Sequence, residues 1–173
     1  MNKKTLALVA TLVLAPALIL PQAGGGDVES VSPGKAYEML QAPGTFLVDV
    51  RSVAEYCLVG HPEIAYNVPI TFWSEEEARF VANADFLEDL KARFKMEDTL
   101  LFICKGGGRS RKAAEMAKAA GFEKAINIGE GFEGEADEKG LRTKNGWKNS
   151  LPYTYTVEPR LAYKKSADTA RAL

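Results

Sequence analysis

The most restrictive feature of the chain is a short apolar run that ends in a cysteine and leads into a helical stretch. Residues 100–103 are continuously apolar, which is typical of a strand buried on both faces of a sheet. Residues 113–120 are rich in alanine and other strong helix formers. Cys104 therefore lies where a buried strand stops and a helix begins, the edge at which open parallel sheets bind ligands.

The residues that follow Cys104 suit an anion. Three glycines at 106–108 allow the backbone to curl until several N–H groups point at one centre. The basic residues around them are Lys105, Arg109 and Arg111. If the loop curls around the sulfur, these groups favour the nucleophilic thiolate over the thiol. The alternatives are a cysteine that only fills the core and a phosphate-binding loop that makes no use of it.

The cysteine loop, read with two upstream motifs, resembles the single-domain rhodaneses, a sulfurtransferase family. The motifs are Cys104-Lys-Gly-Gly-Gly-Arg109-Ser110, Leu47-Val-Asp49-Val-Arg51 and Gly60-His61, and the similarity spans about residues 31–147. The resemblance implies a loop cysteine that takes a sulfane sulfur from a donor, holds it as a persulfide and passes it to a thiophilic acceptor. Exported bacterial rhodaneses have a similar Gly-Trp and Leu-Pro ending.

The alternation of strand and helix patterns predicts an α/β fold with a mainly parallel five-stranded sheet and helices on both faces, as in rhodaneses. The expected strands are residues 28–31, 45–50, 65–70, 100–103 and 124–128. Ser74 and Glu77 form a capping-box pattern, and the apolar residues from Phe80 to Phe94 are compatible with helical packing in the core. Phe72 and Trp73 are candidates for the mouth of the site or for contact with a partner protein.

Three segments are expected along the chain: a signal peptide at residues 1–23, a rhodanese-like domain at 24–150 and a carboxy-terminal extension at 151–173. A basic start, an apolar stretch at 5–20 and a small-residue stretch at 21–26 are typical of secretory signal peptides, and an uncleaved anchor is the alternative. The protein is therefore expected to be periplasmic or secreted. The last ~15 residues are expected to form a mobile tail or a loose helix.

The charged residues outside the cysteine loop are expected to have structural roles. Asp49 and Arg51 are interpreted as a supporting ion pair, and Glu55 as a surface residue. His61, the single histidine of the chain, is interpreted as structural, although it is also a candidate base for Cys104. Cys57 is expected to be a buried hydrophobic residue, with a resolving role toward Cys104 as the alternative.

Composition restricts the partners. With 22 basic and 23 acidic residues and a net charge of −1, nothing suggests nucleic-acid binding. The sequence has no cluster of metal ligands, so neither a metal nor an organic cofactor is expected. The expected partners are small sulfur anions or persulfides and a periplasmic acceptor protein, with membrane contact only if the amino-terminal segment stays uncleaved.

The predicted function is therefore that of a thiosulfate sulfurtransferase, with Cys104 as the nucleophile and Asp49, Arg51 and Arg111 in support. The groups expected to hold the sulfur and its donor belong to Lys105, Gly106, Gly107, Gly108, Arg109 and Ser110. One rival is a cysteine phosphatase or arsenate reductase, whose loop places its arginine six residues after the cysteine, whereas Arg109 stands at five. The other is a non-catalytic binding or sulfur-carrier module.

Overall fold

The computed structural model describes residues 27–166, so the predicted signal peptide and its cleavage site lie outside the described residues. The strands are β1 (Ser30–Val31), β2 (Thr45–Asp49), β3 (Tyr66–Asn67), β4 (Thr71–Ser74), β5 (Arg79–Ala82), β6 (Thr99–Ile103), β7 (Ala125–Ile128), β8 (Glu135–Ala136) and β9 (Arg142–Lys144). The helices are α1 (Pro33–Met39), α2 (Val53–Leu58), α3 (Phe86–Lys91), α4 (Gly108–Ala119) and the 3₁₀ helix η1 (Trp147–Asn149). Within this range no helix combines the length and hydrophobicity needed to cross a membrane.

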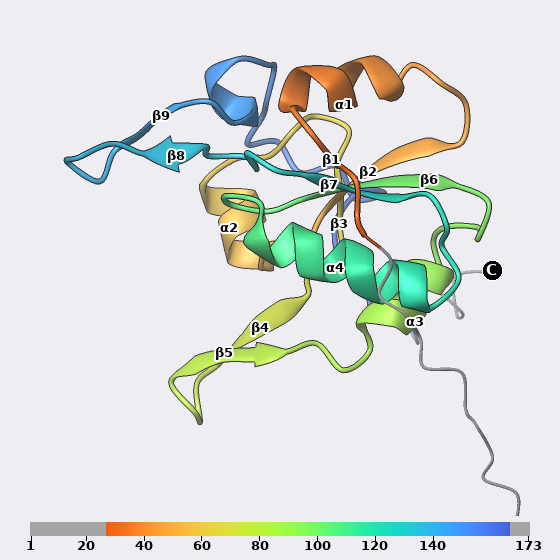
Figure 1. Ribbon diagram of the computed structural model, residues 1–173. Helices are drawn as coiled ribbons and strands as arrows, with labels where there is room; N and C mark the ends of the chain where they lie inside the picture. The colour runs from red at the N-terminus through yellow and green to blue at the C-terminus, as the bar shows by residue number, and fades with distance from the viewer. Residues whose placement is uncertain (1–26, 167–173) are drawn as a thin grey trace, which may run out of the picture.

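A five-stranded parallel sheet forms the centre of the molecule, in the order β1-β7-β6-β2-β3 (Figure 1). The two strands that precede the chemically interesting turns, β2 and β6, pair over five residues, from Thr45 with Thr99 to Asp49 with Ile103. Because both strands run in the same direction, the residues after Asp49 and after Ile103 emerge at the same edge. The predicted α/β fold is confirmed.

Side chains alternate across β6 and divide the core into two layers. Leu100 and Phe102 belong to the layer covered by α3 and α4, whereas Leu101 and Ile103 belong to the layer covered by α1, α2 and η1. All four side chains are fully buried. The continuous apolar run is therefore required, since both faces of this strand contact helices (Figure 1).

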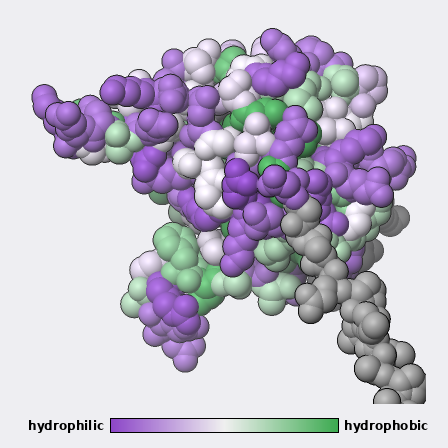
Figure 2. Space-filling model, viewed as in Figure 1, coloured by the Kyte–Doolittle hydropathy of each residue, from purple (hydrophilic) through white to green (hydrophobic). Residues whose placement is uncertain are grey.

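The segment after β3 differs from the prediction. Residues 71–82 form an antiparallel hairpin, β4–β5, and the Ser74 hydroxyl accepts a hydrogen bond from the Glu77 amide within its turn rather than at a helix start. Trp73 pairs with Phe80 across the hairpin, and both rings stay about half exposed, at 55% and 49%. The predicted helix start is therefore wrong, because aromatic and β-branched residues on both sides of this turn favour strands. Figure 2 shows hydrophobic side chains on this hairpin beside a hydrophilic tip, and a mostly hydrophilic β8–β9 arm.

The carboxy-terminal segment packs on the domain as far as residue 166. Thr154 and His61 exchange backbone hydrogen bonds of 2.8 Å, and the Leu161 carbonyl accepts one from the Asn67 amide of the edge strand β3. Leu161 is fully buried, and the Tyr163 hydroxyl donates to Asp89 on α3. Of the last ~15 residues, predicted to be a mobile tail or a loose helix, the described residues 159–166 pack on the domain, and Leu161 supplies a partner to an exposed sheet edge.

Candidate active site

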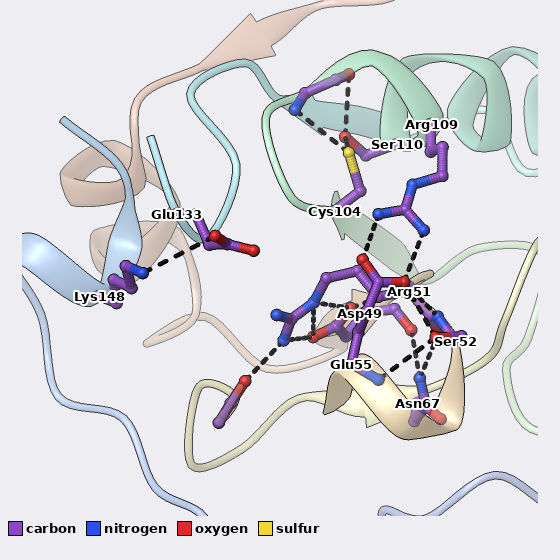
Figure 3. A network of polar contacts seen from close by, with 12 residues as sticks. Asp49, Arg51, Ser52, Glu55, Asn67, Cys104, Arg109, Ser110, Glu133 and Lys148 are labelled. Carbon is purple, nitrogen blue, oxygen red and sulfur yellow. Dashed lines mark hydrogen bonds and ion pairs between the residues drawn. The ribbon is translucent and has the colours of Figure 1, made fainter. Parts of the chain in front are cut away.

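The cysteine loop curls around its own sulfur. Cys104 follows β6, its side chain is 2% exposed, and the Gly107 amide donates a hydrogen bond of 3.2 Å to Sγ. Gly107 has φ +93°, a conformation that glycine adopts without strain, and α4 begins at the next residue. The first amides of α4 have no acceptor within the helix, so the sulfur lies beside a helix end that favours negative charge (Figure 3).

A second loop, residues 129–134 between β7 and β8, holds the carbonyl side of the cysteine loop. The Cys104 and Lys105 carbonyls accept hydrogen bonds from the Phe132 and Glu133 amides, at 2.7 and 2.9 Å. The two backbones are in such close contact that a Cβ on Gly131 would lie 2.6 Å from the Cys104 carbonyl oxygen. Because the carbonyls turn toward the second loop, the amide side of the cysteine loop is free to face the sulfur.

Ser110, on the first turn of α4, contacts the sulfur with its side chain. Its Oγ lies 3.3 Å from Cys104 Sγ, 3.0 Å from the Gly107 carbonyl oxygen and 2.7 Å from Asn127 Oδ1. A hydroxyl carries one proton and can rotate it toward any one of these three neighbours. It can therefore accept from a protonated sulfur, or donate to an ionised one without moving its oxygen.

Asn127, in the middle of β7, fixes this hydroxyl from behind. It is 2% exposed, and its Nδ2 donates to Ser30 Oγ at 3.0 Å on the neighbouring strand. That bond orients the amide so that Oδ1 faces Ser110. A chain of side chains thus connects β1 through β7 to the sulfur.

Arg109 is held in a bidentate ion pair. Its Nη1 and Nη2 donate to Glu55 Oε2 and Oε1 at 2.8 and 2.6 Å, and the two side chains are 30% and 21% exposed (Figure 3). Glu55 also accepts from the amide and hydroxyl of Ser52, which caps α2. Burial raises the pKa of Glu55, but the hydrogen bonds and charge of Arg109 outweigh burial and lower it from 4.5 to about 2. The expectation that Glu55 is a surface residue is therefore wrong. Arg109, which is predicted to orient an anionic donor, is held by Glu55 in this structure.

Asp49 and Arg51 form the expected supporting pair. Arg51 Nε and Nη2 donate to the Asp49 carboxylate at 2.9 to 3.0 Å and 2.6 Å, and both side chains are fully buried. Arg51 also donates to the Gly60 carbonyl, and its guanidinium carbon lies 4.3 Å from the centre of the Phe132 ring. The pair thus joins the turn after β2 to Gly60 and to Phe132, the residue whose amide binds the Cys104 carbonyl.

Four other residues were considered for roles at the site from the sequence: Lys105, Arg111, His61 and Cys57. Lys105 is exposed at the mouth, and its side chain makes no hydrogen bond or ion pair within residues 27–166. Arg111 donates to Ser30 on the exposed side of α4, so its charge is engaged away from the loop. His61 is buried, stacked on Tyr56 at 3.6 Å and within 3.0 Å of the Pro62 carbonyl, as expected of a structural histidine. Both cysteines are free, and Cys57 is half-buried on α2.

The described residues contain no group of three or more side chains that could hold a metal ion. What they present is a single sulfur with hydrogen-bond donors around it. Such a sulfur can act as a nucleophile, and the donors can stabilise a negative charge on it or on an atom attached to it.

Known proteins share this architecture. A family model described as Rhodanese-like domain matches residues 32–137. The chain belongs to the rhodanese family. It is 35% identical over 106 residues to thiosulfate sulfurtransferase 18 of Arabidopsis thaliana, covering 61% of this chain and 76% of the relative. An uncharacterised protein of Rickettsia conorii is 33% identical over 133 residues, 75% of this chain and 99% of the relative. The crystal structure of Rv0390 from M. tuberculosis superposes with a TM-score of 0.64 at 34% identity, covering 75% and 98% of the two chains.

The comparisons place this rhodanese domain in a sulfurtransferase-type family. Two residues that shape its site escaped the sequence reasoning. Asn127 stood out only as an amide within the apolar run of β7, a position where a buried partner is required. Glu55 had a stronger signal, since Ser52 and Glu55 have capping-box spacing, but the reach of its carboxylate to Arg109 depends on tertiary structure.

Proposed function

We propose that the protein is a sulfurtransferase that carries a sulfane sulfur as a persulfide on Cys104. The observation that supports this most is the pair of donors on the sulfur, the Gly107 amide at 3.2 Å and the Ser110 hydroxyl at 3.3 Å, at the start of α4. Such an arrangement stabilises charge on a sulfur atom and lets it attack. The family and its thiosulfate sulfurtransferase relatives support the same reaction class.

In the first step the ionised Cys104 sulfur attacks the outer sulfur of thiosulfate. A new S–S bond forms on Cys104, the S–S bond of thiosulfate breaks, and sulfite leaves with the electron pair. The terminal sulfur of the persulfide then carries the negative charge. We propose that amides of residues 105–110 hold this atom and that Lys105, the exposed cation at the mouth, attracts the donor.

In the second step a nucleophile, cyanide or an acceptor thiolate, attacks the terminal sulfur of the persulfide. The S–S bond on Cys104 breaks, and the cysteine sulfur regains the electron pair and its charge. The Ser110 hydroxyl and the Gly107 amide can stabilise the free sulfur at this stage. Because the donor product leaves before the acceptor reacts, we expect ping-pong kinetics.

The test is formation of thiocyanate from thiosulfate and cyanide. We expect activity in the wild type and in Cys57→Ser, because Cys57 has no contact with the loop sulfur among the described residues. Cys104→Ser should abolish it. Activity that survives in Cys104→Ser, or is absent from the wild type with thiosulfate and with an organic persulfide as donors, would contradict the proposal.

The geometry favours sulfur over a phosphoryl group. Cysteine phosphatases place the arginine of their loop six residues after the cysteine, whereas here Arg109 stands at five and both of its terminal nitrogens are bound to Glu55. The sixth residue after the cysteine is Ser110, which contacts the sulfur itself. We therefore expect no hydrolysis of p-nitrophenyl phosphate under conditions in which thiocyanate forms.

Contact with an acceptor protein and export from the cytoplasm are further parts of the proposal. The exposed Trp73–Phe80 pair of hairpin β4–β5 offers an apolar surface at the domain's edge. A non-catalytic binding role would predict that Cys104→Ser keeps full biological activity.

Amino-terminal sequencing of protein recovered from the periplasm tests the proposed export and the cleavage of the signal peptide after Ala23.

A further inference from the structure

Arg142, on strand β9, lies against the cysteine loop. One of its terminal nitrogens, Nη1, donates a hydrogen bond to the Gly134 carbonyl, and a Cβ added to Gly106 would lie 3.3 Å from the same nitrogen. Gly106 is exposed, so the guanidinium lies on the outer face of the loop. Figure 1 shows the β8–β9 arm on the same side of the molecule as the start of α4.

The absence of a side chain at residue 106 is explained by this arginine. Gly106 does not have the positive φ that favours glycine, in contrast to Gly107 at +93°. A Cβ at Gly106 would meet Arg142 Nη1 at 3.3 Å and the Gly134 carbonyl oxygen at 3.8 Å. Because 3.3 Å is tighter than most Cβ contacts, a side chain there would displace the guanidinium. The glycine therefore leaves room for Arg142 at the loop.

The charge of Arg142 is not neutralised by a carboxylate. The side chain is half-buried, it forms no ion pair within residues 27–166, and the Gly134 carbonyl that it binds is uncharged. The neighbouring carboxylate of Glu133 is paired with Lys148 instead, at 3.8 Å. A guanidinium has five N–H donors, so one that binds a carbonyl keeps its charge and further donors for an anion.

The two arginines on α4 are engaged elsewhere. Both terminal nitrogens of Arg109 bind Glu55, and Arg111 donates to Ser30 on the exposed side of the helix. Arg142 differs from both, because its charge is unpaired among the described residues and its guanidinium lies against the loop itself. It is therefore the arginine best placed to bind an anion that approaches the sulfur.

We propose that Arg142 binds the sulfonate group of an anionic sulfur donor, such as thiosulfate, at the entrance to the cysteine loop. The inference rests on the proposed sulfurtransferase function and names the residue that selects the donor by its charge. Lys105 attracts the anion from solution, and Arg142 orients it with its oxygens on the guanidinium and its outer sulfur toward Cys104. When the S–S bond of the donor breaks, sulfite leaves with the electron pair from the same donors.

Alkylation of Cys104 measures this charge recognition without sulfur transfer. The thiolate attacks the CH₂ carbon of iodoacetate or of iodoacetamide and iodide leaves, but only iodoacetate is an anion. In a Cys57→Ser background, Arg142→Gln should lower the ratio of the iodoacetate rate to the iodoacetamide rate roughly tenfold, the effect of one lost charge-assisted hydrogen bond. Lys139→Gln, which removes the same charge from an exposed residue in the turn between β8 and β9, is the matched control and should leave the ratio unchanged.

The cyanide assay extends the test to the donor. Arg142→Gln should lower kcat/KM for thiosulfate roughly tenfold, mainly through KM, because the contact is made both in the bound donor and in the transition state. Arg142→Lys, which retains the charge, should recover part of the loss. An unchanged kcat/KM in Arg142→Gln would contradict a contact with the donor.

The possible outcomes separate the two proposals. An alkylation ratio that falls in Arg142→Gln and is retained in Lys139→Gln supports the anion site. A ratio that neither variant changes, or that both lower equally, overturns the anion site while sulfur transfer stands. Failure of thiosulfate to place a sulfur on wild-type Cys104 overturns the proposed function, and the alkylation ratio then decides whether Arg142 binds anions at all.

Discussion

Replacing Gly107 by alanine tests whether sulfur transfer requires the close packing of the cysteine loop against its neighbour. A Cβ at this position would lie 1.9 Å from the Gly129 carbonyl oxygen and 2.8 Å from its carbonyl carbon, so the two backbones must separate. The residue also has φ +93°, which an L side chain adopts with strain. A left-handed conformation costs about 1–2 kcal/mol and overpacking about 1–3 kcal/mol, so we expect a loss of about 2–5 kcal/mol of unfolding free energy.

Gly108→Ala is the matched control, because it makes the same chemical change one residue later. No atom lies within 4 Å of a Cβ at Gly108, the first residue of α4. Alanine at a compatible helical position stabilises a protein by about 0.4–1 kcal/mol. The two variants therefore should change stability in opposite directions.

Urea unfolding gives the stability of each variant, and mass spectrometry after a short exposure to thiosulfate gives the rate of persulfide formation. Separation of the backbones should remove the 3.2 Å hydrogen bond from the Gly107 amide to the sulfur. A misplacement of about 1 Å at a reacting centre can lower the rate by about 100-fold, and we expect a loss of this order in the rate of persulfide formation. Wild-type stability and an unchanged rate in Gly107→Ala would refute the claim that this packing shapes the site.

The remaining predictions concern the groups that hold the loop. Glu55→Gln should destabilise the protein at neutral pH. Folding lowers the pKa of Glu55 from 4.5 to about 2, so the stability that its ionised carboxylate contributes is present above pH 4.5 and should vanish as the pH falls to about 2. Urea unfolding curves of wild type and variant that stay separated at about pH 2 would contradict this account. Asp49→Ala should cost about 3–5 kcal/mol in urea unfolding, because it leaves Arg51 buried without its partner, and a cost near zero would be incompatible with the buried pair. Leu161→Ala should cost about 2–5 kcal/mol by the same measurement, whereas no change would mean that residues 151–166 do not pack as described.

The parts of the fold that depend on local pattern could be predicted from the sequence. The composition of the apolar run in β6 was enough to predict a strand buried on both faces. The place of Cys104 at the end of that strand could be predicted in turn, because the cysteine is the residue after the run. The Asp49–Arg51 pair was also predictable, because two opposite charges at the end of a buried strand are stable only when they are paired. Each of these inferences needed residues that are close in sequence.

The features that sequence reasoning missed depend on contacts between distant segments. Arg109 and Glu55 are 54 residues apart, and only the pairing of β2 with β6 brings the starts of α2 and α4 together. Similarly, Leu161 gave no periodic signal in a polar segment, yet it packs beside β3. The hairpin β4–β5 was missed for a different reason, because the same Ser–Glu spacing serves a helix start and a tight turn equally well.

The most direct measurement of the central claim is the intact mass of the protein before and after exposure to thiosulfate, followed by peptide mapping of the modified residue. The account predicts that the wild type gains the mass of one sulfur atom, that the added sulfur maps to Cys104, and that cyanide removes it. An unchanged mass, or a sulfur found on Cys57 with Cys104 unmodified, would contradict it.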